Sequence, residues 1–390
     1  MSSELNPRLI SRARLAVTLT FVSNGLAVGA FVARLPDVKS HLALSNSSLG
    51  TALLAWSIGV VAALGPSGKF CTKYGSAPMV LIGSFGLVIS YPLLGLILNL
   101  SWFCVSLFVF GFSLAFQDVA MNSHAVTLEG KSGRRMMSVF HALFSVGGFA
   151  GGVIGGVFAQ IGVGFLTQTV FVAGIILAIA ISMRTRWLPA ASDIHEITGE
   201  VRVKRPTLLW ILGLFGLCAA IGEGSAGDWG AILARETFMA SPFVSAIPYV
   251  AFSTTMVIGR FSGDRLANKF GVARAISGGG LVAGIGLAVG LVIGTSYGVI
   301  FGWLFLGLGL SFIIPLLFGT AGKLAVTKFK GQIAPSQAVA MVSGITYVGF
   351  IIGPPLLGFV ADAIGLRWAM FLPAVLALLL IVSAKYAKTD

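Results

Sequence analysis

The sequence predicts an all-α membrane protein of twelve transmembrane helices, arranged as two pseudo-symmetric six-helix bundles. Three observations support this fold class. Hydrophobic residues make up 56% of the 390 residues and charged residues only 10%, against about 25% charged in soluble domains. Apolar runs of the roughly 20 residues that a helix needs to cross a bilayer occur twelve times. The two halves of the chain also share short motifs at nearly constant spacing.

The expected spans follow one another through short connections rich in Gly, Pro and Ser. They cover residues 15–35, 47–67, 78–98, 101–125, 136–160, 164–184, 207–227, 243–263, 273–293, 297–320, 336–361 and 366–386. The longest polar segment lies at the middle of the chain. We therefore expect an N-terminal bundle over 1–184, a cytoplasmic linker over 185–206 and a C-terminal bundle over 207–390.

The distribution of Lys and Arg predicts the orientation. If the N-terminus is inside, the predicted cytoplasmic segments hold all of the 26 Lys and Arg residues except Arg34, Lys39, Arg235 and Arg367. Cytoplasmic loops of membrane proteins carry an excess of these residues. We therefore expect a multi-pass protein of the cell (inner) membrane with both termini in the cytoplasm. The same bias accounts for the net charge of +13 without a nucleic-acid partner.

Matching motifs indicate that the two halves arose by duplication. They are FCTKYG (70–75) with LANKFG (266–271), Gly111 with Gly307, and VGGFAGGVIGG (146–156) with VGFIIGPPLLG (348–358). Each pair lies in corresponding spans of the two halves. Any one match is weak, but three in register favour two repeated bundles.

These features resemble the major facilitator superfamily of transporters. Within it, the chain is similar to the fucose-permease-like branch of sugar–proton symporters. DVAMN (118–122) resembles that branch's acid-x-x-x-Asn on the fourth helix, and residues 128–151 resemble its fourth loop and fifth helix. The resemblance implies that Asp118 is the protonatable acid and Asn122 the asparagine of that motif. The branch has a second acid on the first helix, where this chain has Val32.

The superfamily's loop signature, Gly-x-Leu-x-Asp-Arg-x-Gly-Arg, is only partly present. Thr72 and Asn268 stand at its aspartate position, and lysines stand at the arginine position. In the family this loop helps to hold the cytoplasmic gate, so the gate here must use other charges. The gating candidates on this side are Lys73, Lys269, Asp264, Arg265, Glu129, Arg134 and Arg135. The alternative is that they are ordinary solvated charges, because surface ion pairs contribute little.

Asp118 and Asn122 lie inside the fourth span and share one helix face, being four residues apart. A charge at that depth is costly unless it is paired or faces water, so we expect this face to line the central cavity. A buried carboxyl group holds its proton more readily than an exposed one, which suits reversible proton binding. The alternative is a static bond between helices. His141, on the next span, either partners Asp118, binds substrate or packs as a core residue.

The seventh span ends in a glycine-rich stretch that carries two acids, Glu223 and Asp228. Glycine at this density weakens a helix, and discontinuous helices commonly form transporter substrate sites. We expect the two acids to take part in proton coupling and Trp229 to stack on the solute. Alternatively, Glu223 alone is functional, and Asp228 and Trp229 lie at the membrane interface, where Trp is enriched.

Polar residues of the first span extend the candidate set. Asn24 either binds substrate or makes an interhelical hydrogen bond. Arg34 and Asp37 either pair locally or close the outer gate. Arg260, at the inner end of the eighth span, is expected to snorkel to the interface.

The eleventh span holds Pro354 and Pro355, which remove two backbone donors and should kink the helix. The bend serves either the movement between inward- and outward-facing states or packing alone. Weaker substrate candidates inside the spans are Trp56, Gln337 and Tyr347.

The sequence thus predicts a secondary active transporter that moves a small polar solute, sugar-like or similar, by alternating access with proton coupling. The alternative is proton-driven efflux of amphipathic drugs or metabolites. A phosphate-binding loop motif is absent, which argues against ATP drive. The three cysteines and four histidines are scattered and form no catalytic or metal-binding pattern, so we expect neither an enzyme nor a cofactor. The expected partners are the solute, protons and membrane lipid, with the protein acting as a monomer.

Overall fold

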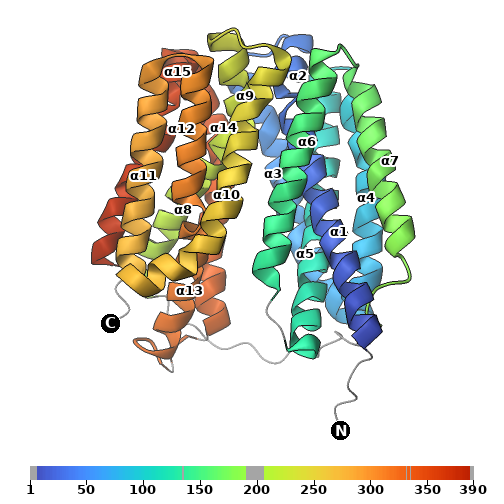
Figure 1. Ribbon diagram of the computed structural model, residues 1–390, viewed down its shortest axis with the longest axis vertical. Coiled ribbons are helices and arrows are strands. Elements are labelled where there is room, and N and C mark those ends of the chain that lie inside the picture. The colour runs from blue at the N-terminus through green and yellow to red at the C-terminus, as the bar shows by residue number, and fades with distance from the viewer. Residues whose placement is uncertain (1–6, 134–135, 190–205, 331, 334, 387–390) are drawn as a thin grey trace. The chain divides into compact units, whose positions relative to one another are not determined.

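Twelve helices of the chain are long and apolar enough to cross a membrane, counted over the described residues. The predicted fold class is therefore confirmed. The computed structural model, shown in Figure 1, describes residues 7–133, 136–189, 206–330, 332–333 and 335–386. The chain forms two compact units: Met1–Ala43 with Ala52–Ile197, and Leu44–Thr51 with Thr198–Asp390.

Helix α1 is the central helix of the first unit and packs most extensively against α6. Helix α4 packs against α5 and α7, and α1 also contacts α5 and α7. The bounds are α1 (Pro7–Val32), α2 (Leu35–His41), α4 (Ser76–Gly95), α5 (Leu100–Ser132), α6 (Met137–Gln160) and α7 (Phe165–Met183). Figure 1 shows α1, α5 and α6 running side by side. Since most of the expected span of α1 is buried, this helix forms the core of the unit.

Glycines bring α1 and α6 into backbone contact. A Cβ atom on Gly25 or Gly29 would collide with the backbone of α6, and one on Gly147 or Gly151 would collide with the backbone of α1. Small residues let membrane helices approach this closely, and the close approach replaces the hydrophobic effect, which is weak between helices in lipid. The abundance of glycine in the sequence is thus explained in part by this interface.

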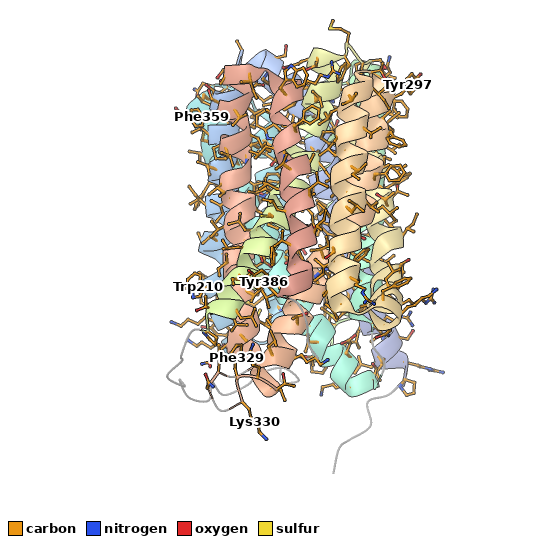
Figure 2. The ribbon with its side chains drawn as sticks, turned by 90° about the vertical axis from the view of Figure 1, so that its left-hand side faces the viewer. Trp210, Tyr297, Phe329, Lys330, Phe359 and Tyr386 are labelled. Atoms are coloured by element: carbon orange, nitrogen blue, oxygen red, sulfur yellow. The ribbon has the colours of Figure 1, made fainter. Side chains whose placement is uncertain are left out.

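The second unit is built on three extensive helix pairs, α8 with α14, α11 with α12, and α10 with α12. The bounds are α8 (Thr207–Asp228), α9 (Gly230–Ile232), η2 (Leu233–Thr237), α10 (Pro242–Phe270), α11 (Val272–Ile293), α12 (Ser296–Leu310), α13 (Ile313–Val326), α14 (Pro335–Ile364), α15 (Leu366–Ala369), α16 (Phe371–Leu379) and η3 (Leu380–Lys385). In Figure 2, Tyr297 and Phe359 mark one end of this unit, and Trp210 and Lys330 lie toward the other.

Helix α3 (Asn46–Tyr74) contributes to both units. Its first residues, up to Thr51, belong to the second unit, and the remainder, from Ala52, belongs to the first. It is therefore a continuous helical connection between them.

The repeated loop has the same backbone in both units. Gly75 and Gly271 both have positive φ, 82° and 84°, with ψ of 157° and 149°. Each also donates its N–H to the carbonyl four residues earlier, at 2.9 Å. Lys73 lies over the ring of Tyr74, and Lys269 over that of Phe270, at 5.0 and 5.2 Å. The sequence match between these loops thus corresponds to a match in conformation.

The tenth span contains a break that is not predicted from the sequence. The tenth span is predicted to be continuous over 297–320, but α12 ends at Leu310 and α13 starts at Ile313. Pro315 lies in the first turn of α13, where a backbone N–H would have no partner within the helix. In the middle of a continuous helix the same proline would disrupt the hydrogen bonding. In the eleventh span, by contrast, α14 continues through Pro354 and Pro355 as one helix, and the kink expected there stays a prediction.

The glycine-rich stretch at the end of the seventh span stays helical through Gly222, Gly224 and Gly227, and the helix is interrupted only after them. Helix α8 ends at Asp228, and a short α9 and the π-helical η2 follow Trp229. The first span also differs, since α1 begins at Pro7 and ends at Val32 instead of covering 15–35. It ends there because the chain turns into α2, whose first turn contains Pro36.

Two of the arginines that the charge argument places outside bind backbone carbonyl groups. Arg34 donates from both terminal nitrogens to the carbonyl of Val163 at 3.1 Å. Arg367 donates to the carbonyls of Leu291 and Val292 at 2.9 and 3.1 Å. Each set of carbonyls lies at or just beyond the C-terminus of a helix, where they lack helical partners. These two exceptions to the charge bias therefore have a structural reason.

Candidate transport site

Asp118 and Asn122 are bonded to each other on α5. The Asn122 Nδ2 donates to the Asp118 carboxylate Oδ1 at 3.1 Å and to its backbone carbonyl at 2.8 Å. Both side chains are half-buried. The predicted sharing of one helix face is therefore confirmed. This arrangement places a carboxylate inside a membrane span with an amide donor as its hydrogen-bond partner.

Gln117, the residue before Asp118, joins three helices and is not singled out by the sequence pattern. Its Oε1 accepts a hydrogen bond from Asn24 of α1 at 2.8 Å, and its Nε2 donates to Ser84 of α4 at 2.8 Å. All three side chains are buried. Of the two expectations for Asn24, the structure contains the interhelical hydrogen bond. The network fixes the rotation of α5 and so sets the direction in which Asp118 points.

Aromatic residues form a cluster in the first unit that includes Trp56. Its ring lies 5.6 Å from that of Phe31 on α1 and 5.5 Å from that of Phe110 on α5. Phe110 also contacts Tyr91 at 5.5 Å, and the Tyr91 hydroxyl donates to the carbonyl of Ala27. Trp56 is half-buried, so part of its surface is not covered by the protein.

Two histidines of the first unit lie in different surroundings. The half-buried ring of His141 packs edge-on against Phe21 of α1 at 5.3 Å, since α6 lies mainly against α1. His124 is buried between Ser76, whose hydroxyl is 2.8 Å from Nδ1, and Leu188, whose N–H donates to Nε2 at 3.2 Å. His124 thereby connects α4, α5 and the segment after α7.

The second unit has its own cluster of polar residues. Glu223 and Asp228 of α8 are half-buried. Arg260 of α10 lies within electrostatic range of Glu223 and of Tyr249, and Tyr249 shares a hydrogen bond with Ser253. Tyr249, Ser253 and Arg260 are four and seven residues apart, so they occupy one face of α10. The cluster thus combines two acids with a guanidinium group and two hydroxyl groups.

Arg260 is predicted to snorkel, and the structure gives it an acidic neighbour in addition. Tyr249 and Ser253 are absent from the candidates named from the sequence. The spacing of Tyr249, Ser253 and Arg260 on one helix face is the signal that could have found them.

Trp229 is fully buried, and so is Trp303 of α12. The close approach of Gly230 to the Trp303 ring accounts for part of this packing. Neither indole N–H has a hydrogen-bond partner among the described residues. The ring of Trp229 therefore presents no exposed face to a solute in this conformation.

The gating candidates differ in their partners. Arg34 pairs with Asp37 at 2.5 Å and donates to Gln168 at 2.9 Å, so the local pair is the alternative that forms. Glu129 accepts hydrogen bonds from the N–H groups of Met136 and Met137, at the start of α6. The exposed candidates are Lys73, Lys269 and Arg265. Outside the described residues lie Arg134, Arg135 and the side chain of Asp264.

The remaining substrate candidates lie on α14. Gln337 is half-buried near the start of the helix. Tyr347 is 47% exposed, and its ring lies 6.4 Å from that of Phe350. Phe350 in turn lies beside Gly224 of α8. Gly224 stands between the two acids of that helix in the sequence.

The family comparison matches most of the chain. The model of the Major Facilitator Superfamily matches residues 17–334 and 229–389. An uncharacterised MFS-type transporter of Yersinia pestis is 32% identical over 374 residues, which cover 95% of each chain. The class E tetracycline resistance protein of Escherichia coli is 24% identical over 375 residues, which cover 91% of this chain and 89% of that protein.

Solved transporters share the fold. The nucleoside transporter NupG superposes with a TM-score of 0.71 at 14% identity, covering 96% of this chain and 98% of that chain. A variant of the fucose:proton symporter FucP of E. coli gives a TM-score of 0.63 at 19% identity, covering 98% and 99%. At these identities the likeness concerns the fold alone.

Proposed function

Because the chain belongs to the Major Facilitator Superfamily of membrane transporters, we propose that it is a proton-coupled secondary active transporter for a small polar solute. The contact between Asp118 and Asn122 is the observation that carries this proposal. It combines a titratable group inside a membrane span with a neutral polar partner. Intramembrane acids are costly and commonly mark ion pathways. Transport proceeds by alternating access, with Asp118 exposed to each side in turn.

Asn122 links the proton to the solute. When Asp118 is ionised, its carboxylate accepts from the Asn122 amide, and the carbonyl oxygen of Asn122 is available to a solute hydroxyl. When Asp118 is protonated, the carboxyl group becomes a donor, and the Asn122 N–H is released from the charged acceptor. The proton therefore changes which groups this helix face offers to the solute.

The second unit carries polar residues of its own that are further candidates for contact with the solute. Glu223, Asp228 and Tyr249 offer two acids and a hydroxyl group, and Arg260 compensates part of their charge. Hydroxyl and carboxyl groups suit a solute with several hydrogen-bonding groups, such as a sugar or nucleoside. The other candidate contacts are His141, Trp56, Gln337 and Tyr347, whereas the buried ring of Trp229 is not among them.

Membrane orientation is inferred from charge. We infer that both termini face the cytoplasm and that the protein resides in the inner membrane as a monomer. The positive-inside bias supports this orientation. The segment that carries Arg34 and Asp37 then lies on the outer side. The charges at the cytoplasmic gate then include Lys73, Lys269, Arg265 and Glu129.

The second candidate function is proton-driven efflux of amphipathic compounds. The similarity to a tetracycline resistance protein favours it. Against it, Asp118 is bonded to the polar side chain of Asn122, and Arg260 lies within electrostatic range of Glu223.

Proton flux in liposomes tests the proposal. Purified protein is reconstituted with an internal pH dye, and sugars, nucleosides, amino acids and drugs are added outside. We expect one polar solute class to acidify the lumen with the wild type and not with Asp118→Asn. Glu236→Gln, the same kind of chemical change at an exposed acid, should behave like the wild type.

Either of two results would contradict the proposal. Coupling in Asp118→Asn equal to that of the wild type would remove Asp118 as proton carrier. Proton movement only with amphipathic drugs, and outward, would favour the efflux alternative.

A further inference from the structure

Asp362 lies near the end of α14 and binds the N-terminus of α3. Its two carboxylate oxygens accept hydrogen bonds from the backbone N–H groups of Asn46 and Ser47, at 3.0 and 2.9 Å. The side chains of Asn46 and Ser47 also bond to the same carboxylate. An anionic group at a helix N-terminus is favourable, because the N–H groups there lack helical partners and carry partial positive charge. Asp362 therefore caps a helix to which it does not belong.

Ser45 completes the cap. Its hydroxyl accepts from the N–H of Ser48 at 3.1 Å, and its backbone carbonyl accepts from the N–H of Leu49 at 3.0 Å. The first four N–H groups of α3 are thus all satisfied, two by Ser45 and two by Asp362. The local half of the cap belongs to α3's own segment of the chain, and the other half comes from α14.

Two glycines bring the same elements into backbone contact. A Cβ atom on Gly50 would lie 2.5 Å from the carbonyl oxygen of Pro354, and one on Gly358 would lie 2.5 Å from the carbonyl oxygen of Asn46. Pro354 and Gly358 precede Asp362 on the same helix. Phe359, at this end of α14, is visible in Figure 2. The start of α3 is therefore held by close packing and by hydrogen bonds to one carboxylate.

This contact has a consequence for movement, because α3 continues from residue 52 into the first unit. If that part of α3 moves away from α14, either the bonds to Asp362 break or α3 bends near Thr51. We propose that Asp362 is a gating residue, a latch that holds the start of α3 on α14 and must release it in each transport cycle. The role of the latch in the transport cycle rests on the proposed alternating access. The inference that Asp362 holds the start of α3 on α14 does not.

Cysteine labelling tests the latch without any solute or proton gradient. Leu49, in the first turn of α3, is fully buried, so a cysteine at this position reports release of the segment. The three native cysteines are first replaced by serine, and Leu49→Cys is labelled with a maleimide in detergent. We expect Asp362→Asn to raise the labelling rate about fivefold to tenfold, since it weakens a charged cap. Asp362→Glu should restore a rate close to that of the parent.

Two controls separate release from fraying and unfolding. Ser45→Ala removes the local half of the cap and should change the rate less than about twofold, since the bonds to Asp362 stay. Leu287→Cys, a fully buried position on α11, should remain unlabelled in the Asp362→Asn background. Gly358→Val should accelerate labelling of Leu49→Cys by steric exclusion of Asn46, even though it leaves the carboxylate intact.

The latch is overturned if Asp362→Asn labels at the parent rate, or if Ser45→Ala accelerates labelling as much as Asp362→Asn does. Faster labelling at Leu287→Cys in Asp362→Asn would also overturn it, since the variant would then be unfolding. Failure of the transport proposal is seen elsewhere, as an absence of solute-driven proton flux in the wild type. A released latch in a protein without such flux would leave this contact established and the proposed function rejected.

Discussion

The acids of the two units have different partners. Asp118 is bonded to Asn122 on its own helix, whereas Glu223 has Arg260 on a neighbouring helix within electrostatic range. The first arrangement is neutral apart from the acid and remains intact if α5 moves as a body. The second places opposite charges of two helices within electrostatic range, and their attraction changes if α8 moves against α10. The first unit is thus suited to carrying a proton, and the second to responding to charge.

The helices that carry these acids also differ in continuity. Helix α5 is continuous around Asp118, and Gln117 ties it to α1 and α4. Helix α8 ends at Asp228, and a different helical geometry follows. Asp118 is therefore held on a rigid support, whereas the second unit has its acids beside an interruption, where backbone rearrangement is less costly.

The largest effect on stability should come from breaking the pair in the second unit. Arg260→Ala leaves Glu223 without its compensating charge. We expect a loss of up to about 2 kcal/mol in the free energy of unfolding, because both groups are half-buried and solvent screens part of their attraction. Chemical denaturation in micelles measures it. Glu223→Gln in the same chain should restore most of the loss, and equal losses in the single and double variants would contradict the pairing.

A smaller effect should follow from Gln117→Ala. The variant removes two hydrogen bonds between buried side chains, although Asn24 keeps its bond to Leu114 and Ser84 its bond to Val80, so we expect a loss of about 0.5–1.5 kcal/mol of unfolding free energy. Asn122→Ala, on the same helix, should cost less than about 0.6 kcal/mol, because its bonds lie within α5. The comparison fails if Asn122→Ala is the more damaging of the two under the same denaturation conditions.

The last comparison concerns the two arginines that bind backbone carbonyls. Arg34→Lys loses the forked contact to Val163, which a lysine cannot reproduce, and we expect a loss of about 1 kcal/mol. Arg367→Lys should cost less, because Arg367 is more exposed than Arg34, which is 5% exposed. Thermal unfolding of the purified variants measures both, and a larger loss at Arg367 would reverse this ranking.

Much of the fold could be predicted because the bilayer imposes long apolar helices. The spans, and the shared face of Asp118 and Asn122, follow directly from helical periodicity. The repeated loop could also be predicted from the sequence match. In the structure, Gly75 and Gly271 adopt the same backbone conformation in the two units. The break between α12 and α13 was not predicted, because residues 297–320 form an apolar run long enough to cross a membrane, and a proline alone does not fix a break, as the continuity of α14 through Pro354 and Pro355 shows.

The missed residues are those whose partners lie far away in the sequence. Gln117 is an ordinary polar residue until α1 and α4 are placed beside it. The interactions of Tyr249 and Arg260 depend on residues of α8, and those of Asp362 depend on the start of α3. Trp229 shows the converse, since its type suggested a binding surface and its position is fully buried. Helical periodicity predicts which residues share a helix face, but only the packing of the helices determines which residues that face contacts.

The central claim, that Asp118 carries the coupled proton, is tested most directly by comparing two modes of transport in the same liposomes. Counterflow exchanges labelled for unlabelled solute with no net proton movement, and accumulation against a solute gradient requires the pH gradient. The account predicts that Asp118→Asn retains counterflow and loses pH-driven accumulation. Accumulation at the wild-type level in Asp118→Asn would contradict it.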